Sequence, residues 1–501
     1  MPTARADVRS RVATSARTTA LSPARATART TALSTARAAG LALLALGVAA
    51  CGGNPGRTTP PPPADPVVAP AAPATSTAAP VPPGSPGPSG PSGVTGVVPA
   101  DVATTLQGVL DARATAVLTR DRAGFDAGLG ADADLRASED RYFASITQLP
   151  LSRFSYRLAP ESLVRTGDGY WGVVEVTTRL GAFDQHAVRT LDRFRFAPDG
   201  ARFVVDSTTD PAWEDAHLGL REPWETGAVT AVRTGNVLGV LDAGTAGRGP
   251  ELVATVAAGV DDVAARVPYA WPRTVVFYAL SDPAFLAGLE EVPGGDPQAL
   301  DAVAFTVPVG PEVGDDAIAS TRFALNGSAL DRLGPRRSAD LARLVRHELT
   351  HVAVGTHDDE APVWLSEGVA EWLSVQALAP GERRVPARTL AAARAGTLRL
   401  PAEDAFNDED AAEHYALAWW MVEWVARARG EQGVWALLDA FTAEPGQDDA
   451  RVVRQVLRVP LAEVARRGAD LMARTYAPVV TEPTDGAPPT GPATSPPPTG
   501  P

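Results

Sequence analysis

Two histidines and a glutamate on one short stretch of the chain carry the clearest chemical signal. His347, Glu348 and His351 form the pattern His-Glu-Leu-Thr-His. On an α-helix, residues four apart lie on the same side, one turn from each other, so the two imidazoles project together. Two nitrogens at that separation suit one tetrahedral zinc ion. The pattern therefore predicts His347 and His351 as metal ligands and Glu348 as the base that takes a proton from a water on the metal.

Local signals place this pattern on a helix of its own. Ser338 is the predicted N-cap, and Gly355 is a natural terminator. Between these two residues the apolar side chains recur at helical spacing, which predicts a buried face made of Leu341, Leu344, Val345 and Val352.

A catalytic zinc ion needs a third protein ligand and one open position. The candidates follow after a short loop, in the segment Trp-Leu-Ser-Glu-Gly-Val-Ala-Glu-Trp, for which Pro362 is the predicted first helical residue. Glu367 and Glu371 lie four residues apart and so share one face of that helix. Their spacing leaves both glutamates open as the third ligand.

The two patterns together resemble the gluzincin metallopeptidases, the clan of thermolysin and aminopeptidase N. In that clan the third ligand is a glutamate on a helix after His-Glu-x-x-His, often within Trp-Leu-x-Glu-Gly, and Glu367 matches that motif. The resemblance implies zinc bound by His347, His351 and Glu367, with the acid at Glu371 holding the first histidine. Glu371 as the ligand in place of Glu367 is the alternative.

The resemblance also points to a second catalytic residue. In aminopeptidase-like members, a tyrosine just before a helix, followed three residues later by a small residue, polarises the oxyanion of the tetrahedral intermediate. Tyr415 and Ala418 have this spacing; the alternative is a core tyrosine on an aromatic-rich helix. The segment Arg322–Asn326 takes the place of the strand that lines the cleft in this clan, where an edge strand can pair with an extended peptide. No Gly-x-Met-Glu-Asn motif is present, so exopeptidase activity is not supported.

The elements around these motifs predict a zincin-like domain over residues 225–476, with a small mixed sheet followed by a mainly helical half. Strands are expected at 229–232, 237–241, 274–280, 303–307 and 322–326, with a helix over 251–267, and helices from 338 onward.

Residues 101–212 predict a separate α+β domain. Helical spacing covers 102–110 and 133–146, strand-like alternation follows, and Asp199-Gly200 marks a hairpin turn. Helices packed on a curved antiparallel sheet resemble the cone-shaped SnoaL-like fold. Asp184 and His186 could line a small-ligand pocket in such a cone. Polar side chains are usually exposed, however, so we expect both to lie in solvent.

The amino terminus is typical of an exported protein. Residues 1–50 combine an arginine-rich stretch with an apolar run over Ala38–Ala50, which is too short to span a bilayer. The run ends at Cys51, the sole cysteine of the chain, and this arrangement resembles a bacterial lipoprotein signal in which Cys51 is lipidated. The alternative is an ordinary secretory signal with a chance cysteine. Residues 51–100 and 477–501 are proline-rich and predict a disordered tether and tail.

Composition narrows the class of partner. The formal net charge is −14, which argues against nucleic acid as the main partner. A single cysteine excludes a disulfide framework or a thiolate metal cluster. The fold class expected is α+β, and the function expected is a zinc metallopeptidase for peptide or protein substrates, anchored by lipid to the outer face of the cytoplasmic membrane. The alternative function is a non-catalytic envelope scaffold with a degenerate peptidase domain; the oligomeric state is left open.

Overall fold

A computed structural model describes most of the central part of the chain. It covers residues 98–217, 221–289, 300–310, 317–334, 337–443 and 445–476. The export signal, the lipidation of Cys51, nearly all of the tether and the tail lie outside the described residues. Within the described ranges, no helix is both long enough and apolar enough to cross a membrane.

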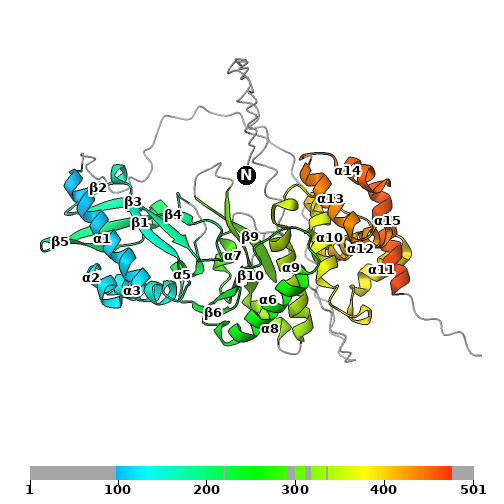
Figure 1. Cartoon of the computed structure of the whole chain (residues 1–501), viewed down its shortest axis with the longest axis horizontal. Coiled ribbons are helices and arrows are strands. Elements are labelled where there is room, and N and C mark those ends of the chain that lie inside the picture. Colours follow the sequence, from blue (N-terminus) through cyan, green and yellow to red (C-terminus); the bar gives the residue numbers. More distant parts are fainter. Residues whose placement is uncertain are drawn as a thin grey trace, which may run out of the picture.

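The front part, residues 98–217, is a curled antiparallel sheet with helices on its inner face (Figure 1, blue and cyan). The sheet order is β1-β3-β4-β5, with β2 paired to β3. The turn predicted at Asp199-Gly200 is confirmed, with Gly200 in the left-handed region at φ 63°. The elements are α1 (Ala100–Thr119), α2 (Arg122–Ala127), α3 (Ala133–Ile146), β1 (Arg153–Leu158), β2 (Val164–Thr166), β3 (Gly169–Arg179), β4 (Val188–Asp199), β5 (Arg202–Ser207) and α4 (Pro211–Glu214).

A second, mixed sheet lies in the middle of the molecule in the order β6-β7-β8-β10-β9. Strands β7, β8 and β10 run parallel, and the two outer strands are antiparallel to their neighbours. Its elements are α5 (Pro223–Thr226), β6 (Thr230–Thr234), β7 (Val237–Leu241), α6 (Gly249–Ala264), β8 (Val275–Leu280), α7 (Ala284–Ala287), β9 (Ala302–Pro308) and β10 (Ile318–Asn326).

The strand order corrects one expectation. Arg322–Asn326 belongs to β10, which is an inner strand between β8 and β9, so it does not line a cleft as an edge. The edge strands of this sheet within the described residues are β6 and β9, and β9 pairs with β10 through Ala304 opposite Phe323. Sequence alternation identifies strands but does not rank their order in a sheet, because order depends on long-range pairing.

The rest of the described chain is helical, as expected, with α8 and α9 beside the mixed sheet and the later helices at the right of Figure 1. The α+β fold class predicted from the sequence is confirmed. The helices are α8 (Gly327–Leu333), α9 (Ser338–Val354), α10 (Val363–Ser374), α11 (Ala387–Ala395), α12 (Ala411–Arg429), α13 (Glu431–Ala443), α14 (Asp449–Leu457) and α15 (Leu461–Thr475).

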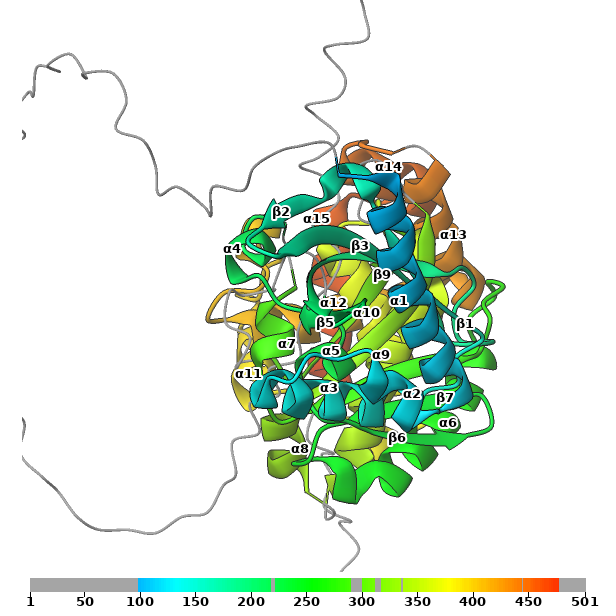
Figure 2. The same ribbon diagram turned by 90° about the vertical axis from the view of Figure 1, so that its left-hand side faces the viewer.

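The mixed sheet is buried on both faces, which explains its nearly continuous apolar strands. On one face, side chains such as Tyr278 and Phe305 join the core of the front part. On the other face, Phe277 and Phe323 join the core formed with α6, α9 and the later helices. Figure 2 shows the front part from its outer side, with the mixed sheet and the helices behind it.

Close contact between α10 and α12 depends on a glycine. A Cβ atom at Gly368 would lie 2.7 Å from the carbonyl oxygen of Ala418 and 2.9 Å from Cγ2 of Val422. Because the nearest atom belongs to helix backbone, it cannot move aside cheaply. Gly368 therefore sets the distance between the two helices directly beside Glu367.

We expect Gly368→Ala to destabilise the protein by about 1–3 kcal/mol, because the added methyl group overpacks this helix contact. Urea denaturation measures the change. The matched control is Gly108→Ala in α1, where an added Cβ meets nothing within 4 Å and the better helix propensity of alanine gives a gain of up to about 1 kcal/mol. Equal midpoints for Gly368→Ala and the wild type would contradict the packing argument.

Candidate metal centre

Helix α9 carries both predicted histidines into the core. It runs from Ser338 to Val354 and ends at Gly355, which has φ 57°. Ser338 is the first helical residue and Arg337 precedes it as the N-cap, one residue from the expected position. Helix α6 packs tightly on α9, since a Cβ at Gly259 would lie 2.8 Å from a methyl group of Leu349. This packing fixes α9 and leaves its histidines facing α10.

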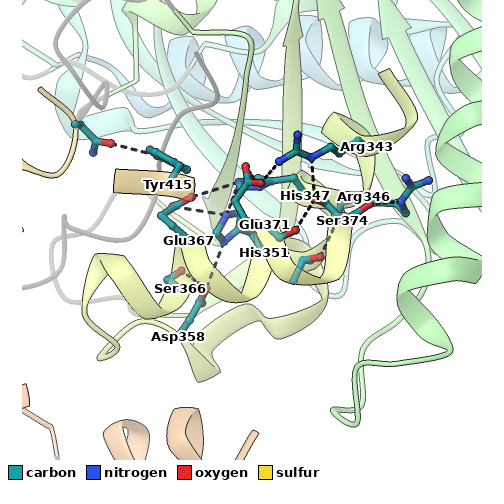
Figure 3. A network of polar contacts seen from close by, with 12 residues as sticks. Arg343, Arg346, His347, His351, Asp358, Ser366, Glu367, Glu371, Ser374 and Tyr415 are labelled. Carbon is teal, nitrogen blue, oxygen red and sulfur yellow. Dashed lines mark hydrogen bonds and ion pairs between the residues drawn. The ribbon is translucent and has the colours of Figure 1, made fainter. Parts of the chain in front are cut away.

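Three side chains from α9 and α10 converge at one point (Figure 3). His347 Nε2 lies 3.3 Å from Glu367 Oε2, and His351 Nε2 lies 3.7 Å from Glu367 Oε1. The two Nε2 atoms are 3.3 Å apart. All three side chains are at most 5% exposed, and one atom from each lies within 4.8 Å of the others. His347, His351 and Glu367 thus form a buried group that could hold a metal ion.

The other glutamate occupies a different place. Glu371 Oε1 lies 3.4 Å from Nδ1 of His347, on the far side of the ring from Glu367. Its second oxygen accepts a hydrogen bond from Arg343. Of the two candidate ligands, the structure therefore groups Glu367 with both Nε2 atoms and puts Glu371 behind the first histidine.

The second histidine has an equivalent partner that sequence reasoning missed. Asp358 Oδ2 lies 3.4 Å from Nδ1 of His351, and the hydroxyl of Ser366 donates a hydrogen bond of 2.7 Å to the same oxygen. A carboxylate on the outer nitrogen orients an imidazole and makes its inner nitrogen a better ligand. Asp358 belongs to an acidic loop between the helices, and nothing in its local sequence separates it from its acidic neighbours.

The charges of this cluster favour a dication. With both imidazoles neutral, Glu367, Glu371 and Asp358 carry three negative charges, and Arg343 compensates one of them. Two negative charges are then left in a buried site, where unpaired charge is costly. Two nitrogen ligands and one carboxylate oxygen, with a net charge that a divalent ion would neutralise, fit such an ion in both donor type and charge.

The histidines and Glu367 have shifted pKa values because they neutralise one another. Burial by itself would lower the pKa of His347, but Glu367 and Glu371 outweigh it and raise the pKa to about 9. Burial would raise the pKa of Glu367, but the two histidines lower it to about 2. In the metal-free protein, protons on the imidazoles therefore supply the positive charge that this site requires.

Glu348 stands apart from these pairs. It is fully buried, and neither carboxylate oxygen has a hydrogen-bond partner among the described residues. Burial raises its pKa to about 7, against the opposing effect of His347 and His351. The backbone of Ala304 in β9 also lowers this pKa, although its contact falls short of hydrogen-bond geometry. A buried carboxylate with no partner indicates a group that acts on something brought to it.

Tyr415 lies next to Glu367, at the end of the polar network opposite Arg343 (Figure 3). It is the fifth residue of α12, not a residue just ahead of the helix. Its ring centre is 6.5 Å from that of His347, and its hydroxyl donates a hydrogen bond of 3.1 Å to Asn407. Sequence reasoning did not identify Asn407.

Other polar candidates lie elsewhere. His357 stacks on Tyr269, and His414 contacts the carbonyl oxygen of Phe406, so neither belongs to the cluster. His186 is exposed, as expected. Asp184 is not: it is 2% exposed and forms an ion pair with Arg322. The expectation that Asp184 is solvated was wrong because its partner comes from the mixed sheet, distant in sequence.

No known protein family, curated protein or solved structure matches this chain significantly. The functional argument therefore rests on the geometry and chemistry of the site.

We expect Asp358→Asn to weaken metal binding by about 10- to 100-fold, because His351 loses the charge that orients its ring and raises its basicity. Calorimetric titration of the metal-free protein with Zn²⁺ as the test ion measures this. Glu360→Gln, on the same loop and exposed, is the control. Equal affinities in both variants would show that Asp358 does not support the site.

Metal affinity should rise with pH between neutral pH and about pH 9. His347 has a pKa of about 9 in the metal-free protein, so at neutral pH it is protonated and must release a proton before it can bind a metal. Affinity then increases by about tenfold per pH unit for each proton released, and the contribution of His347 ends above its pKa. Dissociation constants for Zn²⁺ measured across this interval, together with the number of protons released on binding, test whether affinity increases with pH. An affinity that stays constant or falls with pH would contradict the release of a proton from His347.

Proposed function

We propose that this protein is a zinc-dependent metallopeptidase of the gluzincin type. The observation that carries the proposal is the convergence of His347, His351 and Glu367 beside the unpartnered carboxylate of Glu348. Two imidazoles and one carboxylate are the ligand set of catalytic zinc sites in peptidases, which keep one position open.

Zinc in this position would polarise a peptide carbonyl and lower the pKa of a bound water. Glu348, with its pKa of about 7, is suited to accept a proton near neutral pH and to pass it to the leaving amine. Tyr415 supplies a phenol close to His347, and we assign to it a hydrogen bond to the developing oxyanion. Glu371 and Asp358 hold the two imidazoles in their orientation.

The position of β9 supports a peptide or protein substrate. β9 is one of the two edge strands of the mixed sheet within the described residues, and the backbone of Ala304 lies beside Glu348. An edge strand offers free backbone groups to an extended peptide. A peptide paired with β9 would pass directly in front of the carboxylate that acts as the base.

The location outside the cytoplasmic membrane is also a proposal. It is supported by the apolar run before Cys51, by the single cysteine of the chain and by the proline-rich stretch that follows. In this proposal a lipid on Cys51 anchors the protein, and the tether holds the folded region away from the membrane surface. The net charge of −14 gives no support for a nucleic-acid partner.

The competing proposal is a non-catalytic scaffold in the cell envelope. The observation that favours it is burial: the ligands and Glu348 are at most 5% exposed. The intact set of ligands, base and orienting carboxylates favours the enzyme, because a scaffold has no chemical use for the buried and unpartnered carboxylate of Glu348.

Glu348→Gln should keep zinc and lose peptide hydrolysis by at least about 100-fold, because the amide cannot accept the proton. Elemental analysis gives the zinc content, and mass spectrometry of a mixed peptide library gives the cleavage rate.

His347→Ala is the complementary variant, and it should lose the metal itself. Hydrolysis retained by Glu348→Gln would remove the proposed base. A zinc-loaded wild type that cleaves no peptide would favour the scaffold.

A further inference from the structure

The front part holds the edge of the mixed sheet through main-chain contacts. After β3 the chain crosses to the end of the β9–β10 hairpin. There the N–H of Gln185 donates to the carbonyl oxygen of Ala319 at 2.8 Å. The N–H of Arg189 donates to the carbonyl oxygen of Val309, also at 2.8 Å. β10 is therefore tied to the loop before β4, and the residue that follows β9 is tied to the start of β4.

A buried ionic network lies beside these contacts. Arg322 in β10 is 1% exposed, and its guanidinium lies 2.9 Å from Asp184 of the front part and 2.7 Å from Glu222. Tyr278 in β8 donates a hydrogen bond of 2.5 Å to Glu222, and the N–H of Leu180 donates to Asp184. We call Arg322, Asp184 and Glu222 the clasp.

The cavity next to the clasp is too small for a ligand. Its volume is about 10 Å³, and its lining includes all three residues of the clasp. A space of this size holds about one water molecule. The clasp is therefore a packed joint, and the small-ligand pocket considered for Asp184 has no room here.

The clasp and the candidate metal centre lie on opposite faces of the same strands. Arg322 is paired with Phe305 of β9, and the next residue, Phe323, is paired with Ala304. Successive side chains of a strand point to opposite faces, so Arg322 reaches the front part while Phe323 packs toward α9. Ala304 is the residue whose backbone lies beside Glu348. Arg322 of the clasp is therefore the direct neighbour in β10 of Phe323, the residue that pairs with Ala304.

We propose that Asp184, Glu222 and Arg322 are positioning residues that set β9 at its distance from Glu348, so that the front part is an integral component of the peptidase site. The geometric half of this proposal stands on the contacts above, and its consequence for cleavage rests on the proposed function. A buried charge pair has a narrow range of acceptable geometries, because either partner left alone in the core is strongly destabilising. The clasp therefore fixes β10 relative to the front sheet, and β9, the strand that would bind a substrate, is held through its pairing with β10.

Hydrogen exchange tests the geometric half without any activity. In Asp184→Asn, where the amide keeps the shape of the side chain but loses its charge, amides of β9 should exchange about tenfold faster, while those of α9 stay unchanged. Arg322→Met is the stronger variant, and a thermal melt checks its fold. The control is Asp206→Asn, which removes the charge of one of the two acidic partners of Arg195 elsewhere in the front sheet.

Peptide hydrolysis tests the functional half. Asp184→Asn should raise KM for an extended peptide by about tenfold, with zinc content and kcat close to those of the wild type, because the substrate-binding strand moves while the metal ligands do not. Unchanged hydrogen exchange in β9 would contradict the proposal that the clasp positions this strand, whatever the kinetic result. Faster exchange with an unchanged KM would overturn its role in cleavage. A wild type that binds zinc but cleaves no peptide refutes the proposed function. The hydrogen-exchange result then still tests whether the clasp positions β9.

Discussion

Negative charge confined in a dry core is the constraint on which the architecture depends. Glu367, Glu371 and Asp358 approach two imidazoles between α9 and α10, where water does not screen them. In such surroundings each charge must be met by a partner at close range. Arg343 compensates one of the three negative charges. Protons on the histidines or a divalent ion must compensate the other two. Every helix that packs around the site must preserve these distances.

The packing of the helices serves that requirement. Gly259 lets α6 press against α9, and Gly368 lets α12 press against α10. An added Cβ would meet a movable methyl group of Leu349 at Gly259 but helix backbone at Gly368, so the contact between α10 and α12 is the stricter of the two. A rigid frame of this kind keeps ligand atoms in place before a metal arrives, and it explains why a glycine directly follows Glu367.

The two halves of the molecule are joined as one structure through the mixed sheet. Its strands are apolar on both faces, and each face is covered by a different part of the chain. The ion pair between Arg322 and Asp184 lies within this joint, on the reverse side of the strand next to β9. An edge strand supported only by its neighbour would be free to shift, and the front part supplies the missing support from behind.

Local patterns in the sequence were sufficient for the helix that carries His347 and His351, for the glutamates on the following helix and for the hairpin at Asp199-Gly200. Each depends on residues a few positions apart, where helical periodicity and turn chemistry act directly. Only the tertiary structure decided that Glu367 faces both histidines, that Asp358 supports His351, that β9 lies at an edge of the mixed sheet, and that Asp184 is buried against Arg322. Those outcomes depend on partners far away in the chain, whose approach is determined by packing of whole elements and not by any spacing that the sequence displays.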